Sequence, residues 1–154
     1  MSDRYGFELP ILLARAFRGL IDELHAELSE RGHPDARPIH GFALQAIGTE
    51  GTTVSELGRR LGVSKQAAAK TAASLEAIGY ASRVPDPCDA RATRLIHTSR
   101  GSEMLRLSAE IFERLRAGWV RQLGEARVAA LEDDLESVVA TRGARLGDLP
   151  GWLR

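Results

Sequence analysis

The residues best suited to chemistry in this chain are polar hydrogen-bond donors near the start of one predicted helix. Lys65, Gln66 and Lys70 lie there, and the chain has no lysine outside this helix. A glutamine amide can pair with adenine through two hydrogen bonds, and a lysine can contact guanine or a phosphate. The alanines between them favour the helix and keep it slim enough for a major groove about 12 Å wide. The pattern indicates contact with duplex DNA; a simply solvated helix face is the alternative.

A second group of donors lies in and after a segment rich in proline and aspartate, residues 85–93. Arg91 lies in this loop and Arg94 directly after it, and an arginine held in an extended loop can enter the minor groove. Asp89 precedes Arg91 by two residues and can orient its guanidinium through charge-assisted hydrogen bonds. A solvated loop with an incidental ion pair would be the alternative if this segment stood alone.

Capping and turn residues predict that the lysine-bearing helix is the second helix of a helix-turn-helix. Thr53 and Glu56 form a capping-box pattern for a helix that ends near Leu61. Ser64 is a good N-cap for the next helix, which we expect over 65–78. The short, glycine-containing turn between them holds the two helices at a fixed angle.

Two short strands, expected over 80–84 and 94–98, flank the charged loop and predict a β-hairpin. A hairpin directly after a helix-turn-helix is the arrangement called a wing. Residues 54–100 hold eight basic and four acidic residues, whereas the segments on either side are net acidic and the whole chain is neutral. Positive charge is therefore concentrated on the predicted winged helix-turn-helix.

Amphipathic helices are predicted before and after this region, because apolar residues recur there at spacings of three and four. The predicted helices span 7–31, 39–47, from just after Gly101 to Leu123, and 125–141. The fold class is therefore mainly α with a small β-hairpin wing, in a single domain over 1–154.

Composition and motifs argue against several other classes of protein. No apolar run approaches the roughly 20 residues of a membrane span, and no signal-peptide pattern is visible at the N-terminus. With Cys88 as the one cysteine there is no internal disulfide, so we expect a cytoplasmic protein. The four histidines lack metal-ligand spacing with one another or with Cys88. Because no nucleophile elbow, phosphate-binding glycine loop or zinc-protease motif is present, we expect no enzyme, no cofactor and no metal.

Three runs of this sequence resemble the MarR (multiple antibiotic resistance regulator) family: VSELGRRLGVSKQAA from Val54, LEAIGY from Leu75 and DPCDARATRLIHTSRG from Asp86. The flanking helices match that family in order and length, so the resemblance covers nearly the whole chain. It implies an obligate homodimer, with dimerisation helices at 1–37 and 102–154. It also implies that two winged regions, 38–101, bind a pseudo-palindromic operator and cause repression that a small ligand relieves, or less often activation.

The resemblance also assigns roles to individual residues. The positions where family members touch the major groove correspond to Ser64, Lys65, Gln66, Ala67 and Lys70. Arg91 corresponds to the wing-tip arginine. His40 lies near the opening of the family's effector crevice, which Arg15 and Trp119 also approach. His97 departs from the pattern, since an apolar residue is usual there; either it is a partly buried, hydrogen-bonded histidine or its strand is slightly exposed.

Two alternative functions remain open. A winged helix can be a protein-interaction module without DNA binding, but such a module has little reason to gather positive charge on one face. Cys88 would permit a redox-responsive regulator, because an exposed thiol near Arg91 favours the thiolate. Redox sensors of this family carry their cysteine near the N-terminus, where this sequence has none. Salt dependence tests the first alternative, since displaced counterions make DNA affinity fall steeply with ionic strength.

Overall fold

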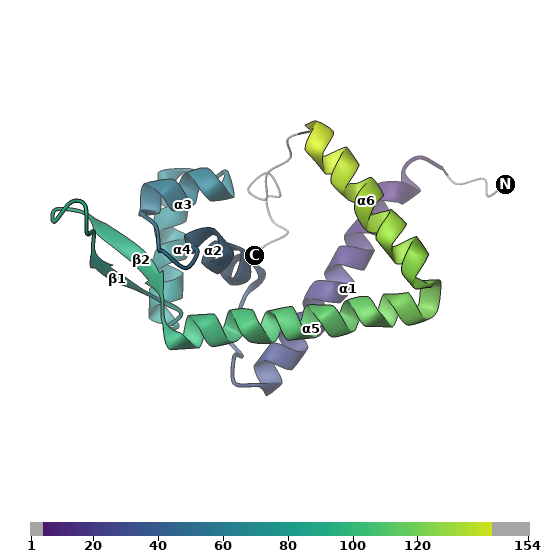
Figure 1. Ribbon diagram of the computed structural model, residues 1–154, viewed down its shortest axis with the longest axis horizontal. Helices are drawn as coiled ribbons and strands as arrows, with labels where there is room; N and C mark the ends of the chain where they lie inside the picture. The colour runs from purple at the N-terminus through teal and green to yellow at the C-terminus, as the bar shows by residue number, and fades with distance from the viewer. Residues whose placement is uncertain (1–4, 143–154) are drawn as a thin grey trace.

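The computed structural model describes residues 5–142, which form six helices and a two-stranded hairpin (Figure 1). In chain order the elements are α1 (Glu8–Glu30), α2 (Pro38–Ile47), α3 (Val54–Leu61), α4 (Lys65–Ala77), β1 (Ala81–Pro85), β2 (Thr93–His97), α5 (Ser99–Leu123) and α6 (Glu125–Arg142). The predicted fold class, mainly α with a hairpin wing after a helix-turn-helix, is confirmed.

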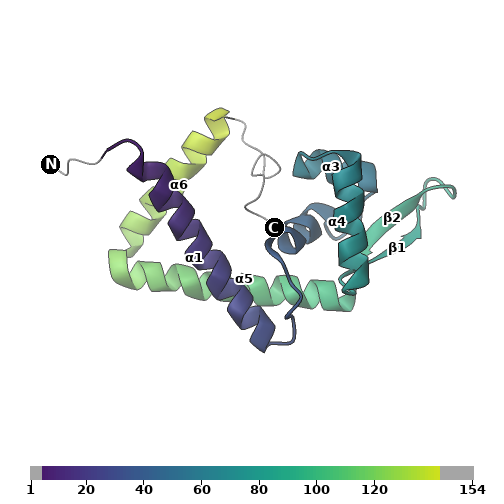
Figure 2. The ribbon, with the colours of Figure 1, turned by 180° about the vertical axis from the view of Figure 1, so that it is seen from behind.

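The long helix α5 connects two parts of the molecule. Figures 1 and 2 show α2, α3, α4 and the hairpin gathered around its first half. Helix α1 packs against α5, and α6 folds back from the far end of α5. None of the helices described is both long and apolar enough to cross a membrane.

Side-chain caps fix the starts of α3 and α4, as the sequence predicts. The hydroxyl of Thr53 accepts a hydrogen bond from the Glu56 N–H at 3.2 Å, and that of Ser64 accepts one from the Ala67 N–H at 3.1 Å. The second half of the expected capping box does not form. The Glu56 carboxylate instead accepts from Arg60 Nε within α3 at 3.0 Å, because a partner one turn away competes for it.

Helix α5 begins at Ser99, earlier than the sequence prediction, which placed its start after Gly101. The reason is a third cap: the Thr98 hydroxyl accepts from the Gly101 N–H at 3.1 Å. Gly101 therefore lies inside the first turn, where a Cβ would overlap the carbonyl oxygen of Tyr80. This close approach fixes α5 against the residue that precedes β1.

The two strands pair antiparallel, with Ala81 opposite His97 and Pro85 opposite Thr93. Both strands are displaced by one residue from the predicted ranges. At the base of the hairpin, Tyr80 is fully buried in the core and Thr98 serves as the cap of α5. Because Tyr80 and Thr98 have these tertiary roles, β1 begins after Tyr80 and β2 ends before Thr98. The local sequence pattern does not reveal such roles.

The core lies where the winged helix-turn-helix meets α1 and α5. It is built from apolar side chains of every element before α6: Leu24, Leu28, Ala43, Leu44, Ile47, Leu57, Leu61, Ala68, Ala72, Leu75, Tyr80, Ala81, Leu95, Met104, Leu107 and Ile111. Helix α6 has Val128 as its one buried apolar residue within the described range. The core therefore fixes the position of α4, and among residues 5–142 it includes no side chain of α6.

Candidate nucleic-acid interface

Helix α4 has one buried face and one exposed face. Ala68, Ala72 and Leu75 are fully buried, and α4 packs against α2 and α3. The exposed residues at the start of the helix are the predicted DNA contacts Ser64, Lys65, Gln66, Ala67 and Lys70. The fold therefore brings all five together at one solvent-facing end of α4.

The turn between α3 and α4 is tight because two glycines permit it. Gly62 ends α3 with φ +71°, a left-handed conformation that side chains disfavour. Gly58 is buried, and a Cβ there would lie 3.1 Å from the Val63 carbonyl oxygen and 3.3 Å from the Ala68 Cβ. This close approach fixes the exposed face of α4 relative to α3.

The tip of the wing is ordered by two aspartate side chains. Asp86 Oδ1 accepts from the Cys88 N–H at 2.8 Å, and Asp89 Oδ1 accepts from the Arg91 N–H at 2.9 Å. Two backbone bonds of Ala92, to Asp86 and Asp89, close the loop. Asp89 was expected to orient the Arg91 guanidinium, but its observed contact is to the backbone. It orders the turn that carries Arg91, whose side chain is exposed.

Arg94 lies in a different environment from Arg91. It is half-buried on β2, and its Nη2 donates to the Gly51 carbonyl oxygen at 2.8 Å, in the loop between α2 and α3. The sequence prediction placed both arginines on the DNA-facing wing without identifying this partner. Nothing in the local sequence indicates it, because Gly51 precedes Arg94 by 43 residues.

His97 is half-buried and hydrogen-bonded, which is the first of the two alternatives that the sequence left open. Its Nε2 lies 2.7 Å from the Leu44 carbonyl oxygen in α2. Because a carbonyl can only accept, Nε2 carries the proton. The bond connects β2 to α2 and gives this polar side chain a partner inside the fold.

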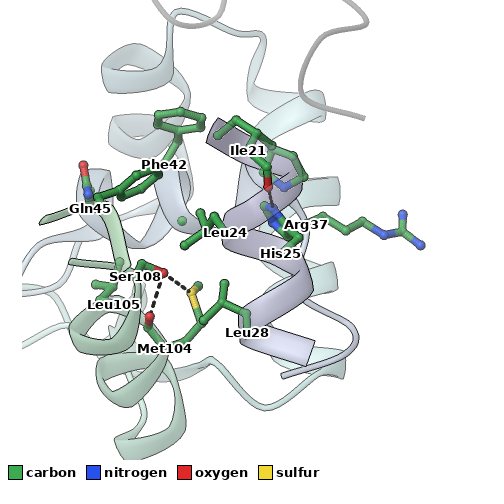
Figure 3. Close-up of a pocket in the computed structure, with 13 residues that line it drawn as sticks. Ile21, Leu24, His25, Leu28, Arg37, Phe42, Gln45, Met104, Leu105 and Ser108 are labelled. Carbon is green, nitrogen blue, oxygen red and sulfur yellow. Dashed lines mark hydrogen bonds between the residues drawn. The ribbon is translucent and has the colours of Figure 1, made fainter. Parts of the chain in front are cut away.

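A small pocket of about 40 Å³ lies between α1, α2 and α5 (Figure 3). It is lined by Ile21, Leu24, His25, Leu28, Arg37, Pro38, Gly41, Phe42, Gln45, Met104, Leu105, Ser108 and Phe112. Arg15, His40 and Trp119, the residues predicted to approach an effector crevice, are not among them. Figure 3 shows the Arg37 guanidinium pointing away from the apolar centre. Within residues 5–142, no group of three or more His, Cys, Asp or Glu side chains is placed to hold a metal ion.

His40 is buried and connects α2 to α4. Its Nδ1 accepts from the Arg37 N–H at 3.1 Å, so Nε2 carries the proton and donates to the Ser74 hydroxyl at 2.9 Å. Burial lowers the pKa of His40 to about 4, and the charges of Arg37 and His25 act in the same direction. His40 is therefore neutral near pH 7, and its tautomer is fixed by the backbone.

A second buried histidine lies at the junction of the α1–α2 loop, β1 and α5. His33 Nδ1 and the Tyr80 hydroxyl are hydrogen-bonded at 2.9 Å, and Glu103 Oε2 lies 3.6 Å from His33 Nε2. Burial and the nearby Arg100 charge lower the pKa of His33, while Glu103 opposes the shift. Arg100 Nη2 also donates to the Gly32 carbonyl at 2.8 Å. No local pattern predicts this cluster, because it joins residues far apart in the chain.

Large apolar side chains are exposed along α1 and α6. They are Tyr5, Phe7, Leu9, Ile11, Leu12 and Leu13 at the N-terminal end, and Leu131, Leu135, Val138 and Val139 in α6. Val138 keeps 53% of its surface exposed and Leu9 63%. Exposed apolar side chains are typical of contact sites where they form a large patch.

The comparisons with known proteins match both the winged region and the whole fold. The model of the MarR family matches residues 37–92, which run from the residue before α2 to the wing loop. No curated protein matches the chain. Among solved structures, the transcriptional regulator Tm0710 from Thermotoga maritima is 27% identical, with a TM-score of 0.58 over 87% of this chain and 93% of that one.

Two further structures share the fold at lower identity. Streptococcus pneumoniae FabT, solved in complex with DNA, is 19% identical with a TM-score of 0.74, over 88% of this chain and 96% of that one. The reduced form of MarR from E. coli is 22% identical with a TM-score of 0.70, over 90% and 99% of the two chains. The sequence match to the MarR family covers α2, the helix-turn-helix, β1 and the wing loop, and the whole described chain shares the fold of these winged helix transcriptional regulators.

Proposed function

We propose that this protein is a DNA-binding transcription regulator, a repressor that binds a pseudo-palindromic operator as a homodimer. The observation that carries the proposal is the exposed face of α4, where Lys65, Gln66 and Lys70 lie together beyond a buried face of small residues. Such a face can enter the major groove, where side chains reach the edges of the bases. The fold shared with S. pneumoniae FabT, which was solved in complex with DNA, supports this assignment.

The residues of the interface divide by the part of DNA that each contacts. Gln66 pairs with a base, and Lys65 and Lys70 contact guanine or phosphates. Ser64 and Ala67 lie beside them at the start of the helix. Arg91 at the exposed wing tip enters the adjacent minor groove, where narrow A·T-rich stretches attract positive charge.

A second copy of the chain covers the apolar surface of α1 and α6. Helix α6 has 18 residues and buries little of its own apolar surface, with Leu135, Val138 and Val139 left exposed. The segments 1–37 and 102–154 would supply this dimer contact. A two-fold dimer presents two α4 helices to half-sites about one duplex turn, roughly 34 Å, apart. Operator symmetry then mirrors protein symmetry.

Regulation by a small molecule would act through the pocket between α1, α2 and α5. At about 40 Å³ the pocket is far smaller than the several hundred Å³ of typical ligand sites, so a ligand must widen it. Widening would move α2, against which α4 packs, and thereby change DNA affinity. The proposed function involves no catalytic step and no cofactor. We place the protein in the cytoplasm.

Selection of bound duplexes from genomic fragments, followed by fluorescence-anisotropy titrations, tests DNA binding. Affinity should fall steeply between low and moderate salt, and Gln66→Ala should relax base preference by about 1–3 kcal/mol at one position per half-site. Arg106→Ala removes an exposed arginine of α5 and serves as the control. A salt-independent affinity, or the same consensus for wild type and Gln66→Ala, would contradict the proposed interface.

A further inference from the structure

We infer that Arg94 is a positioning residue: it holds the wing so that Arg91 reaches the minor groove, and it makes no DNA contact of its own. The inference rests on the proposed function, because it assigns DNA contact to Arg91 and positioning of the wing to Arg94. Sequence analysis placed both arginines on the DNA-contacting surface. It differs from that analysis in removing Arg94 from the DNA-contacting surface.

The first observation is the direction of the Arg94 side chain. Its Nη2 donates to the Gly51 carbonyl oxygen at 2.8 Å. Within residues 5–142 its Nε is buried without a hydrogen-bond partner. The Nη2 bond and the burial of Nε both show that the guanidinium is directed inward. The guanidinium therefore bonds within the protein and does not extend toward DNA.

The second observation is that the loop receiving this hydrogen bond already lies against β2. Thr52 N–H donates to the Leu95 carbonyl at 2.9 Å, and Leu95 N–H donates to the Thr52 carbonyl at 2.7 Å. Gly51 has φ +75°, and a Cβ there would lie 2.5 Å from the Leu95 carbonyl oxygen and 2.8 Å from Ile96 Cγ2. The loop thus acts as a short third strand, and Arg94 extends its attachment by one residue toward the wing tip.

The third observation connects this attachment to Arg91. A two-stranded hairpin alone is only marginally stable in water, so its direction depends on what holds its base. The tip is ordered internally by Asp86 and Asp89 and moves with the hairpin. The position of the Arg91 guanidinium relative to α4 is therefore set by the contacts that hold the hairpin. These include the ion pair between Arg83 of β1 and Glu76 of α4 and, one register position nearer the tip, the Arg94 bond.

A spin label tests the positioning role without DNA. Cys88 is the one cysteine of the chain and is exposed in the wing tip, so a nitroxide can be attached there without other changes. Arg94→Met keeps the apolar stem and removes the donors, and we expect faster motion of the label. Arg100→Met is the matched control, because it removes an arginine whose Nη2 also donates to a carbonyl at 2.8 Å, outside the wing. Unchanged label motion in Arg94→Met would overturn the inference.

A double-mutant cycle on DNA binding separates positioning from contact. We expect Arg91→Ala and Arg94→Met each to weaken DNA binding about tenfold. In each variant the salt slope, meaning the slope of the logarithm of the binding constant against the logarithm of the salt concentration, should be smaller in magnitude by about one. The double variant should bind no more than about twofold more weakly than Arg91→Ala, because non-interacting sites alone give additive losses. Losses that multiply to about a hundredfold, or a salt slope lower by about two, would show that Arg94 contacts DNA and would refute the inference.

Two further outcomes complete the test. If Arg94→Met does not fold, Arg94→Leu, which also lacks a donor, is used in both experiments with the same expected results. If Arg94→Met lowers thermal stability but leaves DNA affinity unchanged, Arg94 is merely structural and the inference fails. If the wild-type protein binds no selected duplex, the proposed function itself is overturned. That result differs from a double variant whose affinity losses multiply, which would refute only the role of Arg94.

Discussion

Lowering the pH from 7 to 5 should destabilise the folded protein through one buried histidine, His40. Its Nδ1 is occupied by the Arg37 N–H, and its side chain is enclosed between α2 and α4. A proton on Nδ1 would break that hydrogen bond and place a charge in the core. Burial accordingly lowers the pKa of His40 from 6.5 to about 4.

The magnitude follows from the difference between the folded and unfolded pKa values. Between pH 6.5 and about pH 4, the unfolded chain binds a proton at His40 that the folded protein does not bind. The free energy of unfolding therefore has the full contribution of neutral His40 above pH 6.5 and loses it as the pH falls toward the folded pKa. The whole shift corresponds to about 3 kcal/mol, of which about 2 kcal/mol is lost by pH 5.

Urea unfolding of wild type and His40→Gln at pH 7 and pH 5 measures this contribution. Glutamine can still donate to the Ser74 hydroxyl but does not titrate, so His40→Gln should be less stable at pH 7 and less sensitive to acid. Burial also lowers the pKa of His33, but His33 is present in both proteins, so its contribution cancels from the difference between them. Protein concentration is kept constant because any dimer couples to unfolding. An equal loss of stability in both proteins would refute the argument.

Four other substitutions, one of them a control, test packing and assembly. Gly101→Ala should destabilise the fold by about 3 kcal/mol, because its Cβ would overlap the Tyr80 carbonyl oxygen. Gly118→Ala in the same helix is the control: its Cβ would meet nothing nearer than 3.6 Å, so it should stabilise the fold by up to about 1 kcal/mol. Melting temperatures that shift equally in the two variants would contradict this prediction. Tyr80→Phe leaves His33 Nδ1 unpaired and should cost about 1–3 kcal/mol in urea unfolding, and an unchanged midpoint would argue against the observed bond. Leu135→Glu places a charge on the exposed face of α6 and should yield a folded monomer by sedimentation equilibrium; a persistent dimer would remove α6 from the interface.

The sequence by itself determined the order of the elements and the exposed donors of α4. Thr53 and Ser64 cap their helices through bonds that span three residues, and Gly62 forms the turn between the helices. Such interactions are local, so residue type and spacing reveal them. The same holds for Lys65 and its neighbours, because polar residues at the start of a helix are expected on its solvent-exposed face.

Only the tertiary structure decided which side chains meet across the chain. Arg94 bonds a carbonyl 43 residues away, His97 one 53 residues away, and His33 a hydroxyl 47 residues away. The strand ends and the start of α5 also shifted, because Tyr80 and Thr98 serve the core and a cap. Partners this distant are brought together only when helices pack, and burial then fixes their roles: Arg94 turns toward Gly51, and His40 becomes neutral.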